Sequence, residues 1–140
     1  MTNILLYNGA NDLKDLLAQT SLEELPQVIL WYDEKSIGIV EDQRELILIK
    51  PDTEVIQSWM HVDDTFHTAH YTVQIWTFKG LDRLGDICNA VFNKIKTNSR
   101  LSINGRNYCD LLCLSSTPLS QDYRQRWGHN YDVQMRLNDP

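Results

Sequence analysis

The densest group of side chains that could bind a metal lies between His61 and His70. It contains His61, Asp63, Asp64, His67 and His70, and imidazole and carboxylate groups are the usual ligands of zinc, manganese and iron. The spacing matches no compact metal-binding template. If the stretch is a strand, His67 and His70 point to opposite faces, whereas a helix places them on one face. A metal-dependent enzyme using these five residues is one hypothesis, and a solvated loop is the simpler interpretation.

Four other residues could form a nucleophilic site if the fold gathers them. Ser115, Ser116, His129 and Asp132 supply a hydroxyl, a base and an acid that could orient the base. The chain has no Gly-x-Ser-x-Gly elbow, the turn that presents the serine in many hydrolases. Since most chains contain such residues, this set alone does not indicate an enzyme.

Arginines and aromatic residues are mixed between Asp122 and Tyr131. Such mixtures can stack bases and neutralise phosphates, and Arg, Trp and Tyr are equally enriched in protein interfaces. The chain has 13 basic and 19 acidic residues and a net charge of −6, so its overall charge does not attract phosphate. We therefore favour a protein interface here, with a plain surface loop anchored by Trp127 as the alternative.

The predicted contact residues come from this segment and from the polar stretch before His70. Trp59 is the first choice for an exposed anchor, because it stands in an otherwise polar and irregular region. The full set is Trp59, His61, Asp63, Asp64, His67, Tyr123, Arg124, Arg126 and Trp127.

Length and composition predict one globular domain over residues 1–140. The chain is 42% hydrophobic and 23% charged, which is typical of globular proteins. No apolar run approaches the ~20 residues that span a bilayer, and the N-terminus lacks the basic region and long apolar stretch of a signal peptide. We therefore expect a protein made in the cytosol, without membrane partners.

The three cysteines are expected to be buried free thiols. Cys109 and Cys113 lie in one strand-like run, which separates them by about 13 Å. A disulfide needs Cα atoms within about 7 Å, so these two cannot pair within a strand.

The second half of the chain has the clearest pattern. β-branched and aromatic residues predict a strand over about 69–78, and apolar residues at helical spacing predict a helix over about 80–97. Asn104-Gly105 predicts a tight hairpin. Strands over 108–114 and 131–137 follow, the second with strict apolar and polar alternation.

The first half is less regular. Asn11-Asp12 can cap a helix that carries Leu13–Leu17, and residues 3–7 either begin this element or form a separate strand. The apolar run Val28–Tyr32 is typical of a strand covered on both faces.

The middle of the chain holds a second buried strand at 46–49, closed by a predicted turn at 50–52. Residues 54–69 could be an exposed hairpin, a loop or a disordered segment, and 117–128 is expected to be a polar loop. Together the elements predict an α+β fold, in which a mostly antiparallel sheet packs with two helices.

This order of elements resembles the tail terminator and tail-completion (neck) proteins of long-tailed bacteriophages and archaeal viruses. The likeness is a pattern of elements that covers most of the chain and includes no invariant motif. The similar parts are Leu13–Leu17, Val28–Tyr32, His70–Phe78, Leu81–Ile95 and the pair Tyr108–Leu114 with Tyr131–Leu137.

The resemblance implies a structural role in the virion, with no catalytic residue, metal or cofactor. Such proteins form a ring, commonly a hexamer, that caps the tail tube and joins it to the head–tail connector. DNA passes through without specific binding, and an acidic lumen would not hold it back. The implied location is the tail or neck of the virion, after assembly in the host cytoplasm.

Two other hypotheses belong to different classes. One is the metal-dependent enzyme built on the His61–His70 cluster. The other is a host protein-binding module that recognises a peptide or protein through the edge of its sheet.

Overall fold

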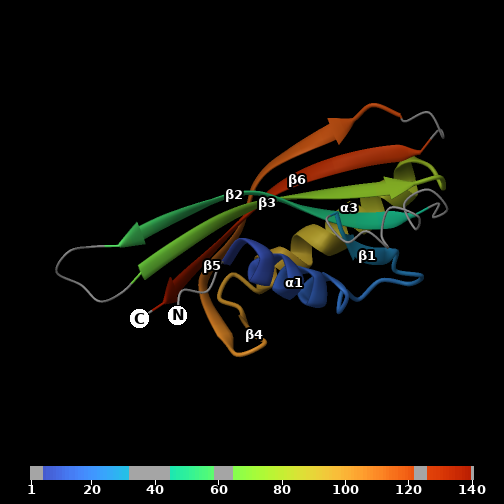
Figure 1. The fold of residues 1–140 in the computed structure, drawn as a ribbon. Coiled ribbons are helices and arrows are strands. Elements are labelled where there is room, and N and C mark those ends of the chain that lie inside the picture. The colour runs from blue at the N-terminus through green and yellow to red at the C-terminus, as the bar shows by residue number, and fades with distance from the viewer. Residues whose placement is uncertain (1–4, 32–44, 59–64, 122–125, 140) are drawn as a thin grey trace.

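The computed structural model describes residues 5–31, 45–58, 65–121 and 126–139. Within them the chain forms two helices and six strands, which confirms the predicted α+β class (Figure 1). In chain order these are α1 (Leu5–Leu17), β1 (Gln27–Leu30), β2 (Leu46–Ser58), β3 (Thr65–Thr77), α3 (Leu81–Thr97), β4 (Ser102–Ile103), β5 (Arg106–Leu119) and β6 (Trp127–Asp139). Neither described helix is both long and apolar enough to span a bilayer.

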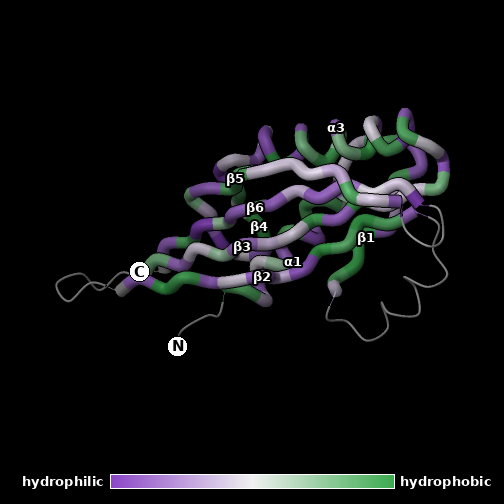
Figure 2. The backbone as a smooth tube through the Cα atoms, turned by 90° about the horizontal axis from the view of Figure 1, so that it is seen from above, coloured by the Kyte–Doolittle hydropathy of each residue, from purple (hydrophilic) through white to green (hydrophobic). Residues whose placement is uncertain are grey.

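The described strands form one sheet in the order β1-β2-β3-β6-β5-β4. β1 and β2 are parallel, and the other neighbouring pairs are antiparallel, so the prediction of a mostly antiparallel sheet is confirmed. Both helices pack on one side of the sheet (Figure 1), which we call the helix face. Figure 2 looks down on the other side, which we call the open face.

α1 begins earlier than predicted, because a distant strand caps its N-terminus. Glu54 of β2 accepts a hydrogen bond from the backbone N–H of Leu6 at 2.6 Å. The carboxylate satisfies one donor of the first turn and places a negative charge at the positive end of the helix dipole. Asn11 and Asp12, the predicted cap, lie inside the helix instead. The first described residues are helical, so the alternative of a separate N-terminal strand is wrong there.

β2 and β3 are longer than the predicted strands and occupy residues 54–58 and 65–69 of the stretch for which a hairpin, a loop and disorder were the alternatives. Within the described residues they pair antiparallel, as in the hairpin. The predicted turn at 50–52 is wrong, because β2 continues through it with a shift of register between Pro51 and Thr53. β1 pairs with β2 only over residues 46–49. The outer edge of β2 therefore needs no N–H at Pro51, and proline is tolerated there.

The second half of the chain lies where its pattern predicts. The hairpin forms at Asn104 and Gly105, whose φ angles of 53° and 78° are those of a type I′ turn. α3 matches the predicted helix, whereas β3, β5 and β6 include most or all of the predicted strands and extend beyond them. The expected loop at 117–128 is shorter than predicted, because β5 runs to Leu119 and β6 begins at Trp127.

The main core lies between the helix face and the two helices. Tyr71, Val73 and Ile75 of β3 are fully buried there, and alternate residues of β6 from Tyr131 to Leu137 join them. This confirms the predicted alternation of β6. A smaller cluster on the other side of the sheet contains Ile29, Leu46, Leu48 and Trp76. β1 contributes to both clusters, as predicted for a strand covered on both faces.

A buried carboxylate ties α1 to the β4–β5 hairpin. Asp12 is fully buried and accepts hydrogen bonds from Arg106 at 2.6 and 2.8 Å, from Asn104 at 2.7 Å and from Tyr108. Burial opposes the ionisation of Asp12, but the hydrogen bonds from Arg106, Tyr108 and Asn104 outweigh it and hold its pKa below the usual value. The hairpin is therefore held to the helix by an ionised group.

The three cysteines are free, but they are not all buried. Cys88 is buried, and Cys113 is half-buried. Cys109 is exposed, so the prediction of burial is wrong for this residue. Its exposure has a local cause, since the register of β5 against β6 shifts between Tyr108 and Asp110.

Gly85 and Gly105 give opposite predictions for the same substitution. Both have open space where a Cβ would lie, but Gly85 is inside α3 whereas Gly105 has a φ of +78°. Gly85→Ala should raise the free energy of unfolding by about 0.5–1 kcal/mol, because glycine is a poor helix residue. Gly105→Ala should lower it by about 1 kcal/mol, because the left-handed conformation strains an L-residue. Chemical denaturation measures both, and two changes of the same sign would contradict the assigned backbone.

Candidate functional site

The centre of the open face is polar, and no described helix covers this face. The register sets its residues in rows across the two central strands, with His70 opposite Gln134, Thr72 opposite Asp132 and Gln74 opposite Asn130. Their side chains are half-buried or exposed. The described part of this face therefore presents hydroxyl, amide and imidazole groups over its centre, as a hydrogen-bonding surface.

The charged side chains of the open face are occupied by neighbours. Asp132 accepts a hydrogen bond from Ser115 at 2.5 Å, and the guanidinium of Arg136 lies 3.6 Å from the carboxylate of Asp110. The ammonium of Lys50 lies 5.4 Å from the centre of an aromatic ring. The charge of Arg136 is offset by Asp110, so it offers little attraction to the phosphates of a nucleic acid. The ring beside Lys50 is neutral, so Lys50 keeps its full positive charge.

His67 and His70 lie on opposite faces of β3, as predicted for a strand. His67 is fully buried on the helix face, where its Nδ1 lies 3.6 Å from the carboxylate of Glu54. His70 is half-buried on the open face. The two rings cannot bind one ion together, and the described residues contain no group of three His, Cys, Asp or Glu side chains placed to hold one.

Three of the predicted contact residues are described, and each packs against the chain itself. His67 is in the core, and Arg126 is buried with its guanidinium 5.4 Å from the centre of the Trp76 ring. Trp127 is partly buried against the main core, the position of a loop anchor. The others lie outside the described residues and stay predictions; they are Trp59, His61, Asp63, Asp64, Tyr123 and Arg124.

The serine, histidine and acid of the nucleophilic set meet on the β5–β6 hairpin, but on different faces. Ser116 Oγ lies 2.5 Å from Nε2 of His129, and burial lowers the pKa of His129. Ser116 pairs with Tyr131 and so lies on the helix face, whereas Ser115 pairs with Asp132 on the open face. Because the acid is on the other side of the sheet, it cannot orient the histidine, and the described residues form no catalytic triad.

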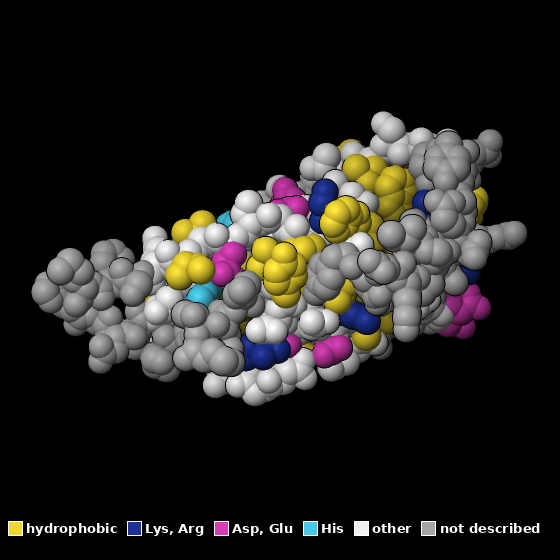
Figure 3. Space-filling view, in the orientation of Figure 1, with side chains coloured by type: hydrophobic (Ala, Val, Ile, Leu, Met, Phe, Trp, Pro, Cys, Tyr) yellow, Lys and Arg dark blue, Asp and Glu magenta, His cyan; other side chains and the backbone are white. Residues whose placement is uncertain are grey.

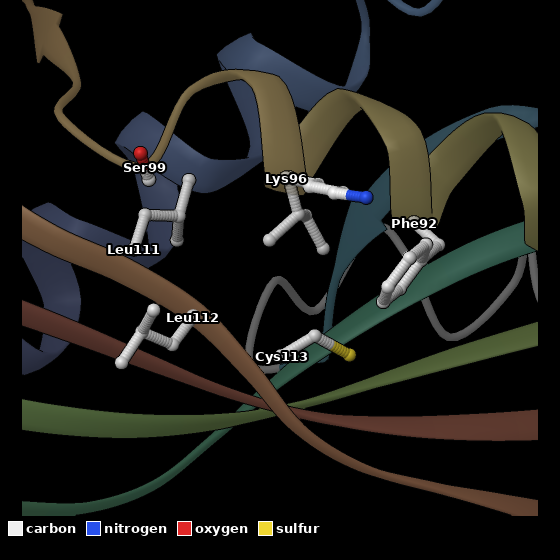
Figure 4. A pocket seen from close by; sticks show the side chains of 7 residues that line it. Phe92, Lys96, Ser99, Leu111, Leu112 and Cys113 are labelled. Atoms are coloured by element: carbon white, nitrogen blue, oxygen red, sulfur yellow. The ribbon is translucent and has the colours of Figure 1, made fainter.

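A hollow beside the outer edge of β5 is the second candidate site. It lies between α3 and β5 and has a volume of about 250 Å³. Figure 4 shows Phe92 and Lys96 extending over it from α3, with the leucines and Cys113 coming from β5. Figure 3 shows that hydrophobic side chains also reach the surface at several other places. The lining residues are Phe92, Ile95, Lys96, Ser99, Leu111, Leu112 and Cys113.

Sequence reasoning missed this site, although the sequence contains a signal for it. The run from Leu111 to Leu114 is apolar throughout, and a strand turns such a run to both of its faces. Leu112 and Leu114 are therefore exposed, as is Phe92 of α3. We call this hollow, together with the outer edge of β5, the β5 groove.

Comparison with known proteins finds a likeness of fold only. No family model and no curated protein sequence matches the chain. Among solved structures, a chain of the "Virion of native gene transfer agent (GTA) particle" matches with a TM-score of 0.52 and 10% sequence identity, over 66% of this chain and 69% of that chain. At this identity, the match shows a shared fold.

Proposed function

We propose that this chain is a virion structural protein of the tail-terminator or neck type, which forms a hexameric ring between the tail tube and the head. The observation that carries this assignment is the polar centre of the open face, backed on its other side by the helices and the main core. The fold shared with a chain of a gene transfer agent virion supports it. So does the order of elements, which resembles that of tail terminators.

The open face suits the lining of a channel through which DNA slides. DNA binding is driven mainly by basic side chains that neutralise phosphates. On the described part of this face, Arg136 is paired with Asp110, and the acidic Asp132 adds no attraction. The net charge of −6 also disfavours retention of DNA. A ring with this face inward would let DNA pass without specific binding.

In this role the chain works through contact surfaces, without chemistry. Its partners would be further copies of itself, the tail tube and the head–tail connector, and its place would be the tail or neck of the virion. The Ser116–His129 contact would then serve to hold the β5–β6 hairpin together.

Native mass spectrometry over a range of protein concentrations tests the proposed assembly. We expect a discrete hexamer to appear as the concentration rises, because ring closure allows no larger species to accumulate. A strictly monomeric protein at high concentration would contradict the proposed ring.

A further inference from the structure

The sheet has two open edges on opposite sides, one at β2 and one at β5. β1 covers β2 only over residues 46–49, and β4 pairs with β5 only at Arg106 and Asn107. Among the described strands, the remainder of each outer edge has no strand partner. The loop after α3 bonds to part of the β5 edge, because the N–H groups of Tyr108 and Leu111 donate to the carbonyl oxygens of Leu101 and Ser99, at 2.7 and 3.0 Å. The free part of the β5 edge therefore lies beyond Leu111. An uncovered edge presents backbone N–H and C=O groups that can pair with another chain.

We propose that the β5 groove of one copy receives the outer edge of β2 of the next copy, which extends the sheet from subunit to subunit. This inference rests on the proposed ring. If successive copies keep the same orientation, β5 and the neighbour's β2 run antiparallel, because β2 and β5 run in opposite directions within one sheet. A head-to-tail contact of this kind closes into a ring when its rotation allows.

Exposed apolar residues match on both faces of the two edges. On β2, Val55 is 50% exposed and Ile56 is 55% exposed. Val55 lies opposite Thr68 and so on the open face, whereas Ile56 lies opposite His67 and so on the helix face. If β2 of a second copy lies beside β5 and the two sheets share the same open face, Val55 lies next to the open face of β5 and Ile56 next to its helix face.

The β5 groove offers a partner for each of them. On the helix face, Phe92 and Cys113 line the hollow that would take Ile56. On the open face, Leu112, which lies opposite Gln134, is 41% exposed and would contact Val55. Cross-strand apolar pairs of this kind stabilise strand pairing.

Charge complementarity favours this occupant over other extended segments. Residues 51–70 contain four acidic side chains and no Lys or Arg, whereas residues 87–109 contain four basic side chains and no Asp or Glu. Two of these eight are already bound within the chain, since Glu54 caps α1 and Arg106 is paired with Asp12. Lys96 lines the groove, and Arg100 is exposed on the loop beyond α3. The acidic segment 51–70 of a second copy is attracted to this basic region, whereas an extended segment with positive charge would be repelled from it.

Photo-crosslinking of the assembled protein tests the contact. A benzoylphenylalanine at position 112 is irradiated in a mixture of ¹⁴N- and ¹⁵N-labelled chains, and the crosslinked peptides are identified by mass spectrometry. We expect crosslinks between labelled and unlabelled chains that map to residues 51–70. The same probe at Leu81, which is 61% exposed at the start of α3, should not reach that segment.

Crosslinks from position 112 that map elsewhere in a hexamer would overturn the docking and leave the ring intact. The absence of any oligomer in the unsubstituted protein would instead overturn the proposed function. As a second measurement, Ile56→Asp should raise the dissociation constant of the assembly at least tenfold with an unchanged melting temperature, while Leu81→Asp should leave association unchanged. Normal association of Ile56→Asp would overturn the docking.

Discussion

Replacing Asp12 with alanine is expected to lower the free energy of unfolding by about 3–5 kcal/mol, the usual cost of removing one partner of a buried ion pair. The variant leaves the guanidinium of Arg106 and the hydroxyl of Tyr108 without the acceptor that each now has. It also releases the β4–β5 hairpin from α1. Urea denaturation at neutral pH measures the loss.

Asp15→Ala is the matched control for Asp12→Ala. Asp15 is an exposed acid on the same helix and binds the same Asn104 side chain at 2.8 Å. Because the group is exposed, we expect a change within about 0.5 kcal/mol. Similar losses in the two variants would contradict the special role of the buried carboxylate.

Acid titration gives Asp12 a second signature. Because its pKa in the folded protein lies below the ordinary value of 3.8, ionised Asp12 stabilises the fold above that value. This stabilisation is lost as the pH falls through the lowered pKa. The free energy of unfolding of the unsubstituted protein should therefore fall below about pH 4, as Asp12 becomes protonated. In Asp12→Asn, position 12 cannot ionise, so the free energy of unfolding should fall less over the same pH range. Parallel pH profiles of the two proteins would contradict this assignment.

Gly9→Ala is expected to cost about 1–3 kcal/mol of folding free energy through overpacking. A Cβ at this buried position would lie well inside van der Waals contact of the Tyr71 hydroxyl. That hydroxyl shares its one proton between the backbone carbonyl oxygens of Leu5 and Leu6, which lie at 3.0 and 2.8 Å. The clash must displace α1 or these hydrogen bonds, so it outweighs the usual gain of alanine in a helix.

A double-mutant cycle with Tyr71→Phe isolates this contact. Removing the hydroxyl removes the atom that the new Cβ meets first, so Gly9→Ala should cost at least 1 kcal/mol less in the phenylalanine background, within the range of couplings measured between contacting residues. Thermal and chemical denaturation of the four proteins give the coupling energy. Additive changes would contradict the assigned contact between Gly9 and Tyr71.

The sequence correctly predicted those elements that are determined by residues close together in the chain. The Asn104-Gly105 turn, the helical stripe of α3 and the alternation of β6 each depend on residues close together in the chain, and each is confirmed. The start of α1 depends on Glu54, a cap that lies 48 residues away. No pattern within the helix could reveal it.

The extension of β2 and β3 has a similar explanation. Lys50-Pro51-Asp52 has the composition of a turn, but Pro51 lies on an outer edge where the sheet needs no N–H from it. Edge position is a property of the sheet order, which the local pattern does not encode. The β5 groove was missed for a similar reason, because the exposure of Leu112 depends on the open face having no covering layer, which the local pattern does not encode.

Electron cryo-microscopy of the assembled protein tests the central claim most directly. The account predicts a closed ring with a central channel wide enough for a DNA duplex, in which the open face lines the channel and the helices lie outward. A ring with its helices on the channel, an open filament, or particles of a single chain would contradict it.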